Sequence, residues 1–241
     1  MKNKFLQAIY AMAITLSITS CSSRHYMATS QNVQVFDDEK QLVISGDVCN
    51  NLYPTGLLEF ESVADVSGSA GYSFHKNIGV ISSYRPYRNP ISKNLSSYLF
   101  ENELVLFKTD HHNWSPALNI GFGIGEIHQD NQDYTLNLSR QFVQPSIGYK
   151  YDWFQFTVSS RLTKANWDLY IDNPNQDNDY FILEGLPNQD VFFIEPAATM
   201  GFEKNDFTFT LQYSKVFQLS NTDVRFNPSS FFVGLKHRFE I

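Results

Sequence analysis

The chain has 241 residues and a formal net charge of -7, with 18 Lys plus Arg against 25 Asp plus Glu. A nucleic-acid-binding surface is basic, so this balance argues against a nucleic-acid partner. Aromatic residues make up 15% of the chain, but no run approaches the ~20 apolar residues of a membrane-spanning helix, which excludes a helical membrane protein.

Residues 1–20 have the pattern of a secretory signal peptide, with Lys2 and Lys4 preceding a short apolar core over residues 9–18. The residues Ile18-Thr19-Ser20-Cys21 that follow resemble the bacterial lipobox. The resemblance implies cleavage after Ser20, a diacylglycerol on the Cys21 thiol and acylation of its freed amine. Several acyl chains, at ~0.8 kcal/mol per buried CH₂, make such an anchor permanent. The alternative is ordinary secretory cleavage nearby, with Cys21 unmodified.

Residues 22–34 have no usable periodicity, so we expect residues 21–39 to form a tether between the lipid and the fold. No acidic cluster follows Cys21. Bacteroidota lipoproteins exported to the cell surface often carry one there, so the resemblance favours an anchor in the periplasm-facing leaflet. Cys49 is then the only other cysteine, and the mature monomer can form no internal disulfide.

From about Gln41 onward, apolar and polar residues alternate with a period of two, which predicts strand after strand. The clearest case is residues 207–214, where Phe207, Phe209, Leu211 and Tyr213 share one face. The segments are near the ~9–11 residues that cross a bilayer at a tilt. The predicted strands are 40–48, 59–74, 78–86, 97–107, 116–127, 140–151, 154–166, 191–202, 207–218 and 230–241.

Short turns alternate with long polar loops along the chain, as in barrels with short periplasmic turns and long outer loops. We therefore expect an all-β fold, a closed antiparallel up-and-down transmembrane β-barrel over residues 40–241, with about ten strands preferred and eight as the alternative. It would be a monomer in the outer membrane. Trp114, Trp153 and Trp167 fall at predicted strand ends, where an aromatic girdle is expected. A soluble lipid-anchored β-sandwich that binds a ligand between its sheets is the alternative fold, since its strands would also alternate.

The last strand places Phe231, Val233, Leu235, Phe239 and Ile241 on one face. This resembles the carboxyl-terminal signal read by the barrel assembly machinery, although Ile241 replaces the usual terminal aromatic residue.

Together with the lipobox, the order of weak elements along nearly the whole chain resembles the small lipid-anchored outer-membrane β-barrel proteins of Bacteroidota. These elements are the hairpin of residues 63–81, the Gly-rich strand of residues 120–125, Gln144-Pro145-Ser146-Ile147-Gly148 and Glu195-Pro196-Ala197. The family is largely without an assigned activity, so the resemblance implies a fold and a membrane and no catalytic residues.

If the ring-bearing face meets lipid, the other face lines the barrel interior. Parity then places four acids and four bases inside: Asp65, Glu101, Glu103, Glu195, Lys150, Arg161, Lys236 and Arg238. Unpaired charges in a narrow interior are costly, so we expect a paired network within a narrow or plugged lumen. The inward glycines at 121, 123 and 125 are expected to make room for larger side chains opposite them.

Candidates for chemistry are weak, and we predict no catalytic residue, metal or cofactor. His111 and His112 beside Asp110 lack a third metal ligand, and His128 lies near two loop carboxylates. The oxygen-rich stretch of residues 172–179 lacks the spacing of an EF-hand. The predicted function is a structural, envelope or small-solute role with outer-membrane lipids and the assembly machinery as partners. The rival is an enzyme at the barrel rim acting on an envelope lipid or peptide.

Overall fold

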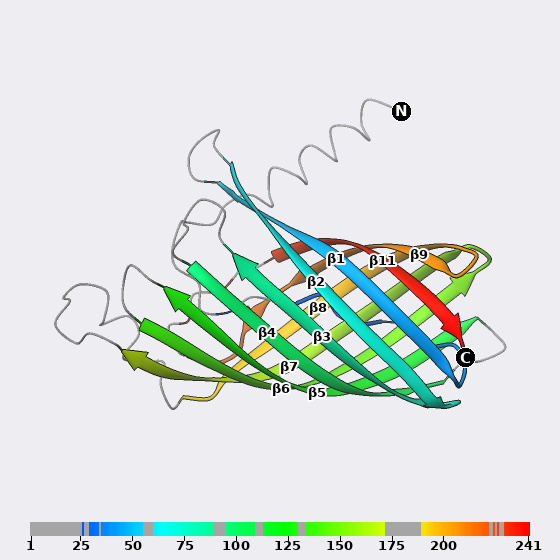
Figure 1. Ribbon diagram of the computed structural model, residues 1–241, viewed down its shortest axis with the longest axis horizontal. Coiled ribbons are helices and arrows are strands. Elements are labelled where there is room, and N and C mark those ends of the chain that lie inside the picture. The colour runs from blue at the N-terminus through cyan, green and yellow to red at the C-terminus, as the bar shows by residue number, and fades with distance from the viewer. Residues whose placement is uncertain are drawn as a thin grey trace.

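The computed structural model describes residues 26, 29–33, 35–54, 60–88, 95–108, 113–129, 134–171, 189–221, 224, 226 and 229–241. Their strands form one antiparallel sheet that closes into a barrel (Figure 1). The strands are β1 Gln41–Pro54, β2 Phe60–His75, β3 Ile78–Arg88, β4 Leu95–Phe107, β5 Trp114–Gln129, β6 Tyr134–Tyr151, β7 Phe154–Ile171, β8 Val191–Lys204, β9 Phe207–Lys215, β10 Phe217–Gln218 and β11 Ser229–Glu240. Both β9 and β10 pair with β8 and are separated only by Val216, so together they form one strand of a ten-stranded barrel.

Each strand pairs with its neighbours in the chain, and the ladder between β1 and β11 closes the sheet, with Gln41 opposite Glu240 and Asn50 opposite Phe231. The predicted up-and-down barrel is thus confirmed, and so is its first strand, predicted over residues 40–48 and observed as β1. Closure matters because hydrocarbon offers no partner for an unpaired backbone group. None of the described residues forms a helix of the length and hydropathy that a bilayer crossing requires.

Large apolar side chains cover the outside of the barrel, from Ile44 on β1 to Phe239 on β11. On β5 they run from Trp114 to Ile124, about 33 Å along the strand, which at the usual tilt of barrel strands spans the ~25 Å of an outer-membrane apolar band. The phenylalanine-bearing faces are exposed, and the described strands form one closed sheet instead of two sheets packed around a dry centre. The soluble sandwich alternative is therefore wrong.

The two ends of the barrel differ in their connections. The turn end carries the short connections 76–77, 108–113, 152–153 and 205–206, together with the start of β1 and the carboxyl terminus, which lies at the right of Figure 1. The loop end carries the connections 55–59, 89–94, 130–133, 172–190 and 219–228. At the turn end, Asp152 and Asn205 adopt positive φ values of 54° in two-residue turns, a conformation that Asp and Asn tolerate better than most residues.

Toward the loop end the two faces of β5, β6 and β7 exchange polarity. On β5 the outward residues become polar beyond Ile124, and on β6 and β7 they are already polar at Gln141 and Lys164, which are in register with Phe122. Closer to the loop end the inside is apolar, with Leu136, Leu138 and Trp167 buried. These strands therefore extend beyond the apolar band, and there the barrel is built like a water-soluble one.

This exchange corrects one prediction. Trp114 and Trp153 are exposed at the turn end as a girdle requires, but Trp167 is fully buried inside the barrel. Its position on β7 has the inward parity of Thr163 and Ala165, and it lies in the part of the strand beyond the apolar band.

Candidate functional site

The lumen is filled by the chain's own amino-terminal segment. We call the described residues between Tyr26 and Phe36 the plug. They precede β1, yet Tyr26, Thr29, Gln31 and Val33 are almost completely buried. Their hydrogen-bond partners come from β1, β4, β5, β6, β7, β8, β9 and β11, on all sides of the barrel wall. This differs from the expectation of a tether for this stretch, because the segment binds the barrel interior along its length.

At the loop end the plug contributes to an apolar layer. The Tyr26 ring stacks on Phe193 with centroids 4.1 Å apart and meets Trp167 edge-on. Leu136, Leu138 and the other members of this cluster surround these rings. The Tyr26 hydroxyl points further inward and donates a hydrogen bond of 2.6 Å to Glu195, which also accepts one from Thr163. The mouth of the barrel is thus closed by side chains packed as in a protein core.

The middle layer is a charged network around Thr29. The Arg140 guanidinium forms an ion pair with Glu101 and donates a hydrogen bond of 2.7 Å to the Thr29 hydroxyl. Arg161 donates to the same hydroxyl at 2.6 Å and lies 3.9 Å from Glu101 and 4.0 Å from Glu103. Because burial of an unpaired charge is costly, these groups stabilise the barrel only as a set, and Thr29 of the plug belongs to that set.

The wall strands shape this layer around the arginines. The Arg161 guanidinium lies over the Phe142 ring, 4.2 Å from its centroid. That ring occupies the space of a missing side chain on β5, since a Cβ at Gly121 would lie 2.3 Å from Phe142 Cζ. The prediction that inward glycines make room for larger residues opposite is confirmed at this position.

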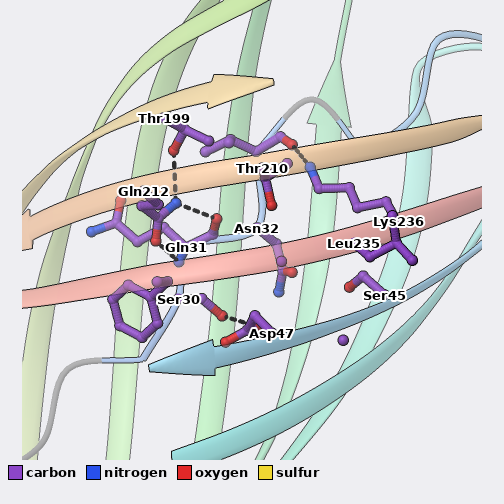
Figure 2. Close-up of a pocket in the computed structure, with 14 residues that line it drawn as sticks. Ser30, Gln31, Asn32, Ser45, Asp47, Thr199, Thr210, Gln212, Leu235 and Lys236 are labelled. Carbon is purple, nitrogen blue, oxygen red and sulfur yellow. Dashed lines mark hydrogen bonds between the residues drawn. The ribbon is translucent and has the colours of Figure 1, made fainter. Parts of the chain in front are cut away.

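Wall amides satisfy the backbone of the plug. The side-chain amide of Gln212 accepts a hydrogen bond from the Gln31 backbone N–H and donates one to the Gln31 carbonyl, as a neighbouring strand would (Figure 2). The Asn32 carbonyl accepts from both Asn119 and Gln144. A segment outside the sheet has buried polar groups that need partners, and these side chains supply them.

A small cavity of about 30 Å³ remains between the plug and β1, β9 and β11. Figure 2 shows the polar groups that line it, among them Ser30, which donates to Asp47, and Lys236, which donates to the Val33 carbonyl at 2.7 Å. The volume suits one water molecule. It is too small to form a continuous path for solutes.

At the turn end the plug finishes in a second apolar layer. Phe36 packs with Val43, Ile81, Val105 and Phe107, and its ring lies against the backbone of β2 and β3. Below it, Asp37 forms an ion pair of 2.6 Å with Arg238, which lies near Glu203. Both ends of the lumen are therefore closed by packed apolar side chains, with a polar layer between them.

Seven of the eight residues that parity placed inside are described with their side chains, and they are distributed over these layers. Glu101, Glu103, Arg161 and Glu195 lie in the buried centre. Lys150 and Arg238 lie near the turn end with Glu203 and Asp37, neither of which was predicted as a partner. Lys236 binds the plug backbone instead of an acid. Asp65 lies in β2, and its side chain is outside the described residues.

Sequence reasoning missed Arg140 and the whole plug. Arg140 is the first residue of the predicted strand 140–151 and has the same inward parity as Phe142 and Gln144, so parity alone could have placed it inside. For the plug, the only available signal was its content of Thr, Ser, Gln and Asn, which is also typical of a linker.

The candidate metal and acid–base residues give no assembled site in the described part of the chain. Asp110, His111, His112 and residues 172–179 lie outside the described residues. His128 is described, and its Nδ1 atom lies 3.0 Å from the Thr135 hydroxyl. Among the described residues, no group of three His, Cys, Asp or Glu side chains is arranged to hold a metal ion.

A closed antiparallel barrel with a continuous outward apolar band defines the protein as an outer-membrane β-barrel. No protein-family model and no curated protein sequence matches the chain. Solved barrels resemble it. The β domain of the Bordetella autotransporter BrkA is 9% identical with a TM-score of 0.46, covering 84% of this chain and 100% of that chain.

The outer-membrane protease OmpT of Escherichia coli is 12% identical with a TM-score of 0.41, covering 83% of this chain and 94% of that chain. The amino-terminal barrel domain of Pseudomonas aeruginosa OprF is 10% identical with a TM-score of 0.36, covering 83% and 98%. At these values no residue role transfers from any of them.

Proposed function

We propose that the protein is a non-conducting outer-membrane β-barrel lipoprotein with a structural role in the envelope, whose lumen is closed by its own plug. The filled lumen supports this role over solute passage. Apolar layers at Tyr26 and Phe36 close the two ends, and Thr29, Gln31 and Asn32 fill the polar middle. Open porins use barrels of ~16–18 strands, whereas ten strands leave room for little more than this segment.

Planar-bilayer conductance tests closure. The wild-type protein should insert without stable ion currents. A variant with residues 26–36 replaced by a Gly/Ser stretch of equal length should conduct if it keeps the heat-modifiable gel mobility of a folded barrel. A milder variant, Tyr26→Gly with Phe36→Gly, removes both apolar anchors and keeps the wall intact. Steady ohmic channels from the wild-type protein would rule out a closed lumen.

Lipid attachment at Cys21 is the second part of the proposal, supported by the lipobox-like residues Ile18-Thr19-Ser20-Cys21. Cells fed an alkyne-bearing fatty acid should label the wild-type chain and leave Cys21→Ala unlabelled. The Cys21→Ala chain should still require detergent for extraction, because the apolar band of the barrel holds it in the bilayer independently of the lipid. Equal labelling of both chains would exclude Cys21 as the attachment site.

The proposal includes no catalytic step. The barrel would reach the membrane through the assembly machinery, guided by the closing strand β11, and would remain a monomer surrounded by lipid. The outward side chains Phe231, Val233, Leu235 and Phe239 on β11 are exposed on the outside of the barrel, which supports contact with that lipid.

A further inference from the structure

The plug has a direction. Tyr26 contacts Trp167 near the end of β7 and forms an isolated parallel bridge with Phe226, both at the loop end. Thr29 and Asn32 lie in the middle layer. Phe36 lies against Phe107, the last residue of β4, at the turn end. The chain therefore enters the lumen at the loop end, descends to the turn end, and reverses there into β1.

The reversal at the turn end is well defined. Lys40 adopts a positive φ of 58°, its backbone N–H donates to Ser73 O at 2.6 Å, and its carbonyl accepts from Ile241 N–H. The side chain of Gln41 accepts from the backbone N–H groups of Asp37 and Asp38. These contacts join the end of the plug to the start of β1 and exclude the opposite direction of threading.

The loop end is the side that faces the cell exterior. In outer-membrane barrels the short connections lie in the periplasm and the long ones lie outside. The connections 172–190 and 219–228 lie at the loop end, and the two-residue connections 76–77, 152–153 and 205–206 lie at the turn end. Tyr26 is therefore in the external half of the barrel.

The length of chain before Tyr26 settles where the mature amino terminus can reach. Tyr26 follows Cys21 by five positions, with four residues between them, and a chain extends at most ~3.3–3.6 Å per residue, so Cys21 lies within about 18 Å of Tyr26. The plug itself spans ten positions to pass from one end to the other. Five positions cannot return that distance, the described lumen is filled by the plug and the side chains packed around it, and the hydrogen-bonded wall closes the sideways route.

We propose that the mature amino terminus is threaded through the barrel and lies at the cell surface, so that the acyl chains on Cys21 enter the outer leaflet. The lipid half of this inference rests on the proposed acylation of Cys21, whereas the direction of threading does not. It reverses the expectation of a periplasm-facing anchor, which came from the lack of acidic residues after Cys21. The partner of the amino terminus is thus the external lipid surface, and Tyr26 and Phe36 hold it there.

Cysteine labelling on intact cells tests the direction. Ser23→Cys should react with a membrane-impermeant maleimide before the outer membrane is opened, as should Asp190→Cys, an exposed control near the loop end. Asn205→Cys in the turn between β8 and β9 should react only after permeabilisation. The unsubstituted chain provides the background, since Cys49 is buried and the proposed acylation blocks the Cys21 thiol. Where Cys21 carries no lipid, the label on Ser23→Cys is read in a Cys21→Ala chain. Ser23→Cys that reacts only after permeabilisation, as Asn205→Cys does, overturns the inference.

Fatty-acid labelling of the same strains separates the two claims. Surface reaction of Ser23→Cys without fatty-acid incorporation supports the direction of threading and rejects the lipid on Cys21. Fatty-acid incorporation with a protected Ser23→Cys leaves the proposed lipoprotein intact and rejects threading to the surface. A second position, Ser22→Cys, should give the same pattern as Ser23→Cys, because both precede Tyr26.

Discussion

The ring of Phe36 occupies the place of a side chain at Gly79. A Cβ atom at residue 79 would lie 2.4 Å from Phe36 Cε2, and one at Gly71 would lie 2.9 Å from Phe36 Cζ. Phe36 of the plug thus packs against two wall glycines on neighbouring strands, both more than thirty positions later in the chain. The inner surface of the barrel wall is therefore complementary to the plug at this point.

Gly79→Ala should therefore weaken the turn-end layer. The added methyl group would overlap the Phe36 ring and the Tyr72 carbonyl, 3.0 Å away, and overpacking of this kind costs about 1–3 kcal/mol. Denaturant-induced unfolding in detergent micelles measures the loss. The matched control is Gly46→Ala, where the nearest atom to the new Cβ, Ser67 O, is 3.6 Å away, and its stability should be unchanged or slightly raised.

A double-mutant cycle isolates the contact. Phe36→Ala alone leaves a cavity beneath Gly79, and the double variant should lose less stability than the sum of the two single variants, because alanine at 36 removes the overlap at 79. Strict additivity would show that the cost of Gly79→Ala comes from the Tyr72 carbonyl and not from the plug.

Arg140→Met should be among the most destabilising single changes in the barrel. It removes the ion pair and the 2.7 Å hydrogen bond to Glu101, and it also removes a donor to Thr29. Loss of one partner of a buried pair costs about 3–5 kcal/mol, because the other charge stays buried. Unfolding followed by tryptophan fluorescence, in a chain with Trp114→Phe and Trp153→Phe so that only Trp167 against Tyr26 reports, would register both the wall and the plug.

The control for this prediction is the exposed pair of Lys164 and Asp190, whose charged atoms are 2.9 Å apart. Their side chains are 43% and 48% exposed, so solvent screens the attraction and Lys164→Gln should cost about 0–1 kcal/mol. If Lys164→Gln lowered the stability as much as Arg140→Met does, burial would not decide the strength of these ion pairs.

The strands could be predicted because the lipid imposes a local rule. Hydrocarbon on one side makes every outward residue of a segment such as residues 207–214 apolar, so alternation locates the strand and its parity assigns the inside. The rule holds only within the apolar band. Leu136, Leu138 and Trp167 break it because water lies outside the barrel at their level, and the predicted starts and ends of β6 and β7 fall short for the same reason.

The plug could not be predicted because its partners are scattered along the chain. Gln31 meets Ser159, Glu195 and Gln212, which belong to three different strands and stand more than 120 positions away. A segment that pairs with no strand of a sheet shows no period-two pattern in its sequence. A segment that contains Gln, Asn and Ser also has the composition of a solvated linker. Parity found several charges of the lumen but missed Arg140, and their pairing was not found, since Asp37 and Thr29 lie in the segment assigned to the tether.

Tyr26→Phe should loosen the external half of the plug while keeping its ring packing. The change removes the 2.6 Å hydrogen bond to Glu195 and leaves that buried carboxylate with the Thr163 donor. Hydrogen bonds to charged groups contribute about 1.5–3 kcal/mol, and stability should fall by that amount. Tyr213→Phe on the outward face of β9 is the control and should have little effect. Equal losses for the two variants would argue against a role of the Tyr26 hydroxyl in holding the plug.

The polarity exchange on β7 predicts where the bilayer ends. Val158 lies within the apolar outward row, and Val158→Arg should cost about 2–4 kcal/mol, as a charge near the bilayer midplane does. Asn166 has the same outward parity eight residues further on, beyond the level of Gln141 and Lys164, so Asn166→Arg should cost about 0–1 kcal/mol. Reversible unfolding from lipid vesicles measures both. Similar costs at the two positions would place Asn166 in hydrocarbon, and the apolar interior around Trp167 would then lie within the membrane and not above it.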